Sequence, residues 1–291
     1  MPSLIDINEE SLKGLTDQVV VLSGMIASKS PVTLCLQLIT CSNTGGSAGI
    51  GLSTATILLR KGAKVVIGDI NEPPRELLDH KDITYLKVDV TSWKDLCALF
   101  RQAKEKYGRI DHVFCNAGIA GSADYLDESV DSDGDPVEPS RATIEVDLMG
   151  MVNMAKLGIW YMKKQEGGGS IILNSSAACT TRFPVVDYVA AKHGVYGLLR
   201  GLFALLYSKF PIRINGLAPA WTDTAIVEHD LVKATNGVLQ SPEVVARSAV
   251  LLMADKSRNG QLLFSSRGKC MEMEEPLLAS NTSLIKEFLA L

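Results

Sequence analysis

The stretch Thr44-Gly45-Gly46-Ser47-Ala48-Gly49-Ile50-Gly51 decides the fold of this chain, because its glycines open directly onto the apolar run 52–59. Gly45, Gly49 and Gly51, at spacings of four and two, predict a tight turn that leads into a helix. Such a turn lets the backbone approach a pyrophosphate, and the free N–H groups of the helix N-terminus offer positive potential to the anion. Glycine-rich turns are common, so the pattern needs support from the following segment.

That segment supplies an acidic residue at the expected distance. The apolar strand 63–68 ends in Asp69, eighteen residues after Gly51. A carboxylate at this place can accept hydrogen bonds from both ribose hydroxyls of an adenine dinucleotide, and it would repel a 2′-phosphate. The sequence therefore predicts a site for NAD, with NADP, which Arg75 could accommodate, as the less favoured cofactor.

Composition narrows the classes of protein that need to be considered. The chain has 291 residues, 46% of them hydrophobic, which is ample for one α/β domain with a large core. A net charge of −4 lacks the basic excess of a nucleic-acid binder. The six cysteines form no CxxC pair, and no histidine stands at metal-ligand spacing. We interpret them as reduced thiols of a cytosolic protein and predict no metal site.

The sequence gives no sign of targeting or of a membrane. Residues 1–15 are acidic and lack a basic segment followed by an apolar one, so they do not resemble a signal or transit peptide. No apolar run reaches the roughly 18 residues of a membrane span. We expect a cytoplasmic protein without membrane contact.

Strands and helices alternate along most of the chain. Apolar runs predict strands at 19–22, 64–69, 84–88, 110–115, 170–174, 212–217 and 261–264, separated by helices at 50–61, 75–79, 92–106, 141–164, 185–209 and 242–253. This order is typical of a Rossmann-type doubly wound parallel sheet with helices on both faces. Nothing suggests a linker, so we predict a single domain over 1–291.

An unusual insert interrupts this order at about 23–43, between the first predicted strand and the glycine turn. It contains a second strand-like run, 34–39, so either 19–22 or 34–39 could be the sheet strand. We favour 19–22, because its lead-in 15–18 is typical of an entry to that strand. Our hypothesis is that the insert is a short intron read in frame, or a splice-variant segment, that disturbs the phosphate turn.

Two further segments concern possible binding partners, a calcium ion and a second subunit. The acidic run 131–135 resembles part of a calcium loop but lacks the glutamate at the twelfth position, and we interpret it as a solvated turn. The helical segments around 144–152 and 194–206 are apolar nearly all round, more than one sheet face requires. We therefore expect a homodimer or a homotetramer.

The catalytic candidates lie after the fifth strand. Tyr188 and Lys192 are four residues apart on a predicted helix, which places both side chains on one face. An ammonium beside a phenol favours the phenolate, so the tyrosine could exchange a proton with a secondary alcohol or ketone. Ser175 and Ser176 follow a strand end, where a hydroxyl could hold the substrate oxygen.

Taken together, these motifs resemble the short-chain dehydrogenase/reductase family across roughly 14–275, and in particular its hydroxyprostaglandin-dehydrogenase-like members. The resemblance implies that Tyr188 is the general acid/base, that Lys192 assists it and binds the nicotinamide ribose, and that Ser176 orients the substrate oxygen. The cofactor-binding residues implied by the glycine turn, the strand ends and the helix are Gly45, Ser47, Gly49, Ile50, Gly51, Asp69, Asp89, Val90, Asn116, Ala117, Gly118, Tyr188, Lys192, Pro219 and Thr224. In this scheme Asn116 also supports the central sheet.

The chain departs from the family pattern at three positions. The serine usually precedes the tyrosine by thirteen residues, which is Ser175, whereas alignment on the following alanines selects Ser176, the residue we favour. The long helix usually carries an asparagine that supports a proton-relay water, and here Asp147 takes its place. An ionised aspartate can accept a hydrogen bond from water but cannot donate one. Ala220 replaces a glycine.

These observations predict an NAD(P)-dependent oxidoreductase that transfers hydride between a nicotinamide cofactor and a secondary alcohol or ketone by a Ser-Tyr-Lys mechanism. The alternative is a member that binds the nucleotide but is catalytically impaired by the insert before the glycine turn. Turnover on a panel of secondary alcohols with NAD distinguishes the two. The segment 221–240, which should cover the substrate, is partly apolar and does not identify it.

Overall fold

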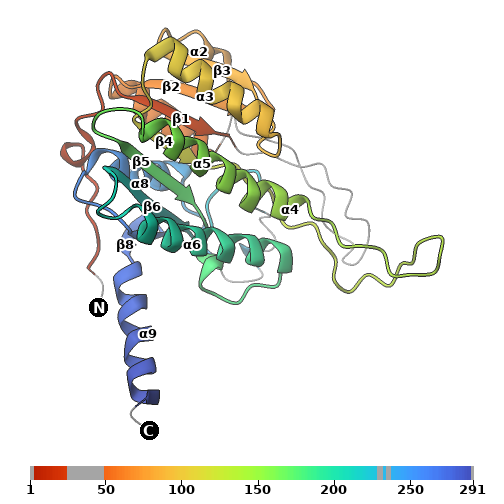
Figure 1. Cartoon of the computed structure of the whole chain (residues 1–291). Coiled ribbons are helices and arrows are strands. Elements are labelled where there is room, and N and C mark those ends of the chain that lie inside the picture. The colour runs from red at the N-terminus through yellow and green to blue at the C-terminus, as the bar shows by residue number, and fades with distance from the viewer. Residues whose placement is uncertain (1–2, 25–48, 228–231, 234–236, 290–291) are drawn as a thin grey trace.

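A single large sheet with helices on both faces forms the body of the protein (Figure 1). The computed structural model describes residues 3–24, 49–227, 232–233 and 237–289. The strands are β1 (Val19–Ser23), β2 (Lys64–Asp69), β3 (Ile83–Lys87), β4 (His112–Cys115), β5 (Gly169–Asn174), β6 (Ile212–Pro219), β7 (Leu262–Ser266) and β8 (Lys269–Glu272). Their order across the sheet is β3-β2-β1-β4-β5-β6-β7-β8.

The first seven strands run parallel, which confirms the predicted doubly wound α/β fold. β1 pairs with β2 on one side and with β4 on the other, so the strand order reverses beside it. Ligands of such sheets bind outside the carboxyl ends of the strands at this reversal. Of the two candidates for the first strand, the favoured run 19–22 therefore occupies the sheet. The insert beyond Gly24 lies outside the described residues.

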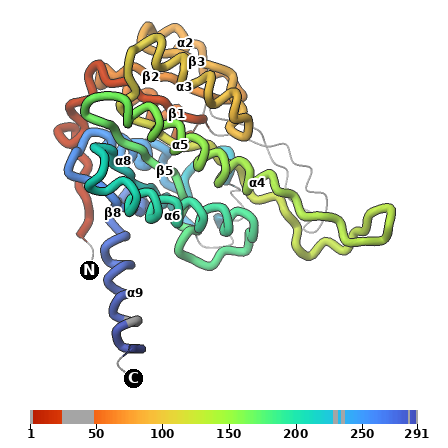
Figure 2. The backbone as a smooth tube through the Cα atoms, viewed as in Figure 1, coloured from red at the N-terminus to blue at the C-terminus, as the bar shows by residue number. Residues whose placement is uncertain are grey.

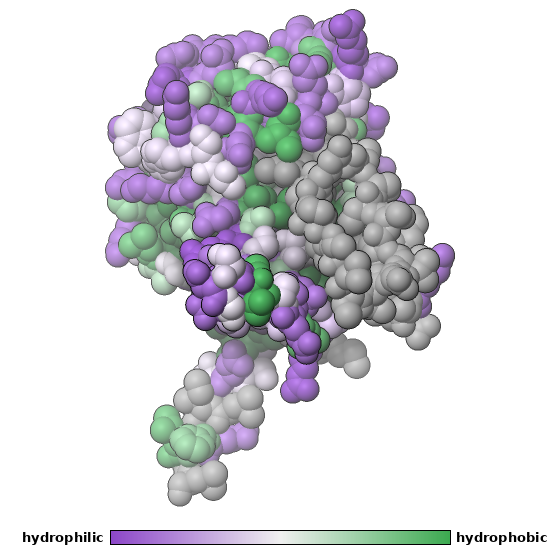
Figure 3. Space-filling model, turned by 90° about the vertical axis from the view of Figure 1, so that its right-hand side faces the viewer, coloured by the Kyte–Doolittle hydropathy of each residue, from purple (hydrophilic) through white to green (hydrophobic). Residues whose placement is uncertain are grey.

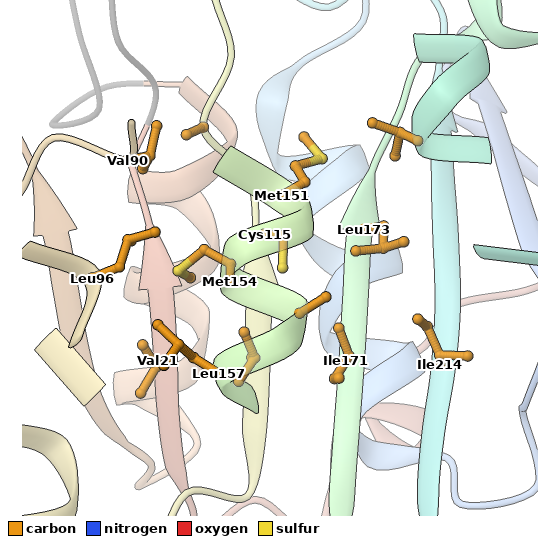
Figure 4. Close-up of a cluster of buried hydrophobic side chains, with 14 of the residues drawn as sticks. Val21, Val90, Leu96, Cys115, Met151, Met154, Leu157, Ile171, Leu173 and Ile214 are labelled. Atoms are coloured by element: carbon orange, nitrogen blue, oxygen red, sulfur yellow. The ribbon is translucent and has the colours of Figure 1, made fainter. Parts of the chain in front are cut away.

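The helices divide between the two faces, because successive side chains of each strand point in opposite directions. Val21 joins the core under α3 (Trp93–Tyr107), α5 (Gly150–Met162) and α6 (Val186–Leu206), and Figure 4 shows Met151, Met154 and Leu157 of α5 beside the labelled strand residues. Val20 and Leu22 join the opposite core, which packs under α1 (Gly49–Arg60) and α8 (Pro242–Ala254). Every residue of β1 is buried, as a central strand covered on both faces requires.

The long helix predicted at 141–164 is not uniform. It consists of α4 (Ala142–Ile144), the π-helical segment η2 (Glu145–Met149) and α5. A π segment contains one residue more per turn than an α-helix and is found mostly at functional sites. The predicted helix 92–106 corresponds to α3, and its N-cap is Ser92, whose Oγ accepts a hydrogen bond from the N–H of Asp95.

Two elements at the carboxyl end were not predicted. β8 turns back antiparallel to β7, and its Cys270 carbonyl accepts a hydrogen bond from the N–H of Ile5 at 2.8 Å. α9 (Glu274–Leu289) follows and projects from the body, and Figure 3 shows hydrophobic residues near its far end. Phe288 and Leu289 there are 75% and 76% exposed.

A second projection is the acidic loop between β4 and α4, which extends from the body as an arm (Figure 2). Its tip is a tight hairpin in which Val130 and Pro136 form a β-bridge. Asp131 Oδ1 accepts hydrogen bonds from the N–H groups of Asp133 and Asp135, and all of these residues are exposed. The acidic run 131–135, interpreted above as a solvated turn, is therefore the exposed tip of this hairpin.

Candidate active site

The carboxyl ends of β1, β4 and β5 are joined by a buried hydrogen-bond network. Ser23 Oγ accepts hydrogen bonds from the N–H groups of Asn116 and Ala117, at 3.0 and 3.1 Å. Asn174 Nδ2 donates to Asn116 Oδ1 at 2.9 Å. Since buried polar groups are costly unless paired, this network holds the three strand ends in a fixed relation at the reversal point. The geometry agrees with a supporting role for Asn116, and it adds Ser23.

Tyr188 and Lys192 lie on α6, and the structure brings them beside the end of β5. Lys192 Nζ is 5.3 Å from the centre of the Tyr188 ring and donates a 3.4 Å hydrogen bond to the Asn174 carbonyl. Lys192 is 4% exposed, whereas Tyr188 is only partly buried. The Tyr188 side chain is therefore partly accessible to a ligand, whereas the Lys192 ammonium is enclosed.

The two candidate serines have different environments. Ser175 is 4% exposed, and its Oγ donates to the backbone carbonyl of Lys192 at 2.9 Å. Ser176 is partly exposed, and its Oγ accepts a 3.2 Å hydrogen bond from the N–H of Ala178. The Ser176 hydroxyl is thus free to donate to a substrate oxygen, whereas the proton of Ser175 is already engaged. The geometry favours Ser176.

Asp147 lies in the middle of η2 and meets Lys192 directly. Its Oδ2 is 3.0 Å from Lys192 Nζ, and its Oδ1 accepts a hydrogen bond from the N–H of Ile119 at 2.8 Å. Gly118 lies against this pair, since a Cβ at that position would come within 3.1 Å of Asp147 Oδ2 and 3.4 Å of Nζ. Only glycine fits there without moving the charged groups.

Burial and charge act in opposition within this pair. Burial raises the pKa of Asp147 above its ordinary value, and the neighbouring Lys192 charge only partly reverses that effect. Burial alone would lower the pKa of Lys192, but Asp147, Tyr188 and Cys179 outweigh it, so the pKa is raised. Lys192 therefore remains an ammonium throughout the neutral range.

Asp69 ends β2 with its carboxylate buried at the crevice, 2% exposed. Oδ1 accepts a 2.9 Å hydrogen bond from the N–H of Asn71, while Oδ2 has no hydrogen-bond partner among the described residues. Burial raises the pKa of Asp69 to about 6, against the lowering effect of the backbone N–H groups of Asn71 and Ile70. A Cβ on Gly24 would lie 1.6 Å from Oδ2, so a residue without a side chain is required above the carboxylate.

The remaining predicted cofactor residues lie at or just beyond the carboxyl ends of the strands, or at the start of a helix. Gly49, Ile50 and Gly51 open α1, Asp89 is exposed after β3, Pro219 ends β6, and Thr224 is partly buried beyond it. The Val90 side chain, in contrast, is 2% exposed and packs against Gly150 of α5, so only its backbone could meet an adenine. Gly45 and Ser47 lie outside the described residues. All of these assignments stay predictions.

Besides Ser23, sequence reasoning missed a second contact residue. Asp187, immediately before Tyr188, is 1% exposed, and its Oδ2 accepts hydrogen bonds from the N–H groups of Ser122 and Ala123. It fastens the base of the acidic arm to the start of α6. The available signal was an aspartate in the first turn of a helix, but its partners lie 64 and 65 residues away along the chain.

The fold agrees with the results of comparison with known proteins. The family model described as short chain dehydrogenase matches residues 41–233. The chain belongs to the short-chain dehydrogenase/reductase family. It is thereby an NAD(P)-dependent oxidoreductase, as predicted.

The relatives cover most of the chain. It is 44% identical over 239 residues to the short-chain dehydrogenase/reductase ascJ of Acremonium egyptiacum, across 81% of this chain and 80% of that protein. It is 27% identical over 263 residues to 15-hydroxyprostaglandin dehydrogenase [NAD(+)] of Homo sapiens, across 80% of this chain and 92% of that one. The crystal structure of levodione reductase superposes with a TM-score of 0.68 at 22% identity, covering 88% of this chain and 98% of the other, which supports the fold.

Within the described ranges, no helix is long and apolar enough to cross a membrane.

Proposed function

We propose that this protein transfers hydride between NAD and a secondary alcohol or ketone, with Tyr188 as the general acid/base. The observation that carries the proposal is the placement of Tyr188 beside the carboxyl end of β5, with Lys192 Nζ 5.3 Å from its ring and the Ser176 hydroxyl free to donate. Each of the three groups serves one need of the reaction: a proton carrier, a charge that stabilises its phenolate, and a donor that fixes the substrate oxygen.

The residues present fit a nicotinamide dinucleotide. The buried Oδ2 of Asp69 lacks a partner among the described residues and can accept a hydrogen bond from a ribose hydroxyl, and Gly24 lets the backbone lie directly against this carboxylate. When bound, the nicotinamide accepts or supplies the hydride. A carboxylate in this position disfavours a 2′-phosphate, which supports NAD over NADP. Lys192 would hold the nicotinamide ribose, and Asn116 the strand ends beneath it.

In alcohol oxidation, Ser176 holds the substrate hydroxyl while the Tyr188 phenolate takes its proton as the hydride leaves carbon. In ketone reduction, the Tyr188 phenol gives its proton to the carbonyl oxygen as hydride arrives. The Lys192 ammonium lowers the cost of the anionic form of Tyr188 in both directions. The protein supplies the proton through Tyr188 and the orientation through Ser176, so removal of the phenol abolishes the proton transfer alone.

Tyr188→Phe tests this assignment, because it keeps the ring and removes only the hydroxyl. We expect turnover on a panel of secondary alcohols with NAD to fall by about 10²-fold or more, with little change in NADH affinity measured by fluorescence. Tyr207→Phe, at a 60% exposed tyrosine at the far end of α6, is the control and should retain turnover. Equal turnover in Tyr188→Phe and the unmodified protein would refute the mechanism.

The insert before the glycine turn gives the second candidate, a member that binds nucleotide without turnover. NADH binding with no activity on any substrate of the panel would favour it, and deleting residues 25–43 should then restore activity. We further propose that the protein is cytoplasmic and forms a homodimer or homotetramer. Trp160 and Leu205 of α5 and α6 are 46% and 54% exposed, which suits a second subunit on that face.

A further inference from the structure

Asp147 forms a buried ion pair with Lys192, the lysine of the proposed mechanism. The Asp147 side chain is fully buried, and its Oδ2 lies 3.0 Å from Lys192 Nζ. The ammonium is therefore enclosed between this carboxylate, the Asn174 carbonyl at 3.4 Å and the Tyr188 ring, whose centre is 5.3 Å away. An ion pair in such a water-poor position is only slightly screened by salt.

The two carboxylate oxygens of Asp147 have different surroundings: Oδ1 accepts a hydrogen bond, whereas Oδ2 is in ion-pair contact with Lys192. Oδ1 accepts from the N–H of Ile119, just after Gly118, and Oδ2 faces Nζ. Asparagine has one acceptor oxygen, so it could serve only one of these two donors and would turn an N–H group toward the other. An aspartate is the residue that can connect the loop after β4 to the lysine ammonium in this way.

Resting on the proposed function, we propose that Asp147 is a positioning residue that fixes Lys192 Nζ and offsets its positive charge where it faces Tyr188. The consequence concerns the proton of Tyr188. A cation stabilises the phenolate, and an anion 3.0 Å behind that cation weakens the effect. Removing the Asp147 carboxylate should therefore strengthen the stabilisation that the Lys192 ammonium gives to a phenolate at Tyr188.

The other titratable groups around the pair do not replace this charge. Cys179 of the short helix η3 (Ala177–Cys179) faces Lys192, but burial raises its pKa, so the thiol is neutral. Asp187 on α6 interacts with Asp147, yet its Oδ2 is bonded to the N–H groups of Ser122 and Ala123. Asp147 is thus the carboxylate in contact with Nζ within the described part of the chain.

The ionisation of Tyr188 can be measured without substrate. Phenolate absorbs in the near ultraviolet, so the difference between titrations of the unmodified protein and Tyr188→Phe isolates this tyrosine from the others. The same difference between Asp147→Asn and the double variant Asp147→Asn/Tyr188→Phe gives its midpoint without the charge. We expect the midpoint to fall by about one pH unit in Asp147→Asn.

Asp111→Asn is the matched control. Asp111 is also a buried carboxylate that accepts a backbone hydrogen bond, from the N–H of Val19 at 2.9 Å, and pairs with a cation, Arg109, at 2.6 Å. It precedes β4, at the opposite end of the sheet from Tyr188. The midpoint of Tyr188 should stay unchanged in this variant, since the removed charge is far from the phenol.

An unchanged or raised midpoint in Asp147→Asn would overturn the proposal, as would an equal fall in Asp111→Asn. If Asp147→Asn does not fold, Asp147→Ser removes the same charge with a smaller side chain and carries the same expectation. The titration needs no turnover, so it stands apart from the proposed function, which fails instead if Tyr188→Phe retains activity.

Discussion

Asp69→Asn should stabilise the unliganded protein at neutral pH while weakening its hold on the dinucleotide. The Asp69 carboxylate is 2% exposed, and burial raises its pKa from 3.8 to about 6. A carboxyl whose pKa is raised on folding favours the folded state below its unfolded pKa and loses that advantage as pH rises through its folded pKa. Above about pH 6, the ionised Asp69 therefore lowers the free energy of unfolding.

The magnitude follows from the two pKa values. The difference between the folded and unfolded pKa values lowers the free energy of unfolding by about 3 kcal/mol at about pH 8, where the carboxyl is ionised in both states. At about pH 4.5 the same linkage lowers the free energy of unfolding by only about 1 kcal/mol. Asparagine keeps an oxygen for the N–H of Asn71 and leaves its amide nitrogen where Oδ2 already lacks a partner among the described residues. The comparison therefore isolates the charge.

Urea unfolding of the unliganded Asp69→Asn and unmodified proteins at both pH values measures this difference. We expect the variant to gain stability at about pH 8 and most of the gain to disappear at about pH 4.5. Asp89→Asn, at an exposed carboxylate, is the control and should show no such pH-dependent gain. A gain of equal size at the two pH values, or a loss at the higher one, would refute the argument from burial.

Three further predictions concern single residues. Asp69→Ala should lower the ratio of kcat/KM with NAD to kcat/KM with NADP, because it removes both the acceptor for the ribose hydroxyls and the repulsion of a 2′-phosphate. An unmodified protein that already prefers NADP would contradict this. Ser23→Ala should cost about 1–3 kcal/mol in urea unfolding, since it leaves the N–H groups of Asn116 and Ala117 unpaired, and a cost near zero would show that the network is not needed. Gly168→Ala should destabilise far more than Gly134→Ala, because both have positive φ but only the first would place a Cβ 1.8 Å from the Pro211 carbonyl; equal midpoints of denaturation would contradict that.

The parts of the fold that the sequence predicts are those carried by periodic patterns. The apolar runs that became β1, β2 and β5 are central strands buried on both faces, and such strands have few alternatives. β8 was missed because it is short and only partly buried, although its hairpin with β7 is local. Its other neighbour, Ile5, is far away in the sequence. Local pattern contains no record of such contacts.

The candidate site divides in the same way. The spacing of Tyr188 and Lys192 predicts a shared helix face, and the structure places them so. The ion pair between Lys192 and Asp147 was not predictable, because it joins residues 45 positions apart and depends on a π-helical turn. Val90 was assigned to the adenine by resemblance, but the packing of α5 buries its side chain, which sequence alone does not reveal.

The π-helical segment η2 has a consequence for how this region can vary. Each residue added to a helix turns the part of the chain before it by about 100° relative to the part after it. The extra residue in η2 thus sets the direction in which α4 and the acidic arm leave the helix, as well as the face from which Asp147 reaches the lysine. A single-residue deletion within 145–149 would rotate the arm and withdraw the carboxylate in the same step. The direction of the acidic arm and the ion pair of Lys192 therefore depend on the same turn, and length changes there affect both.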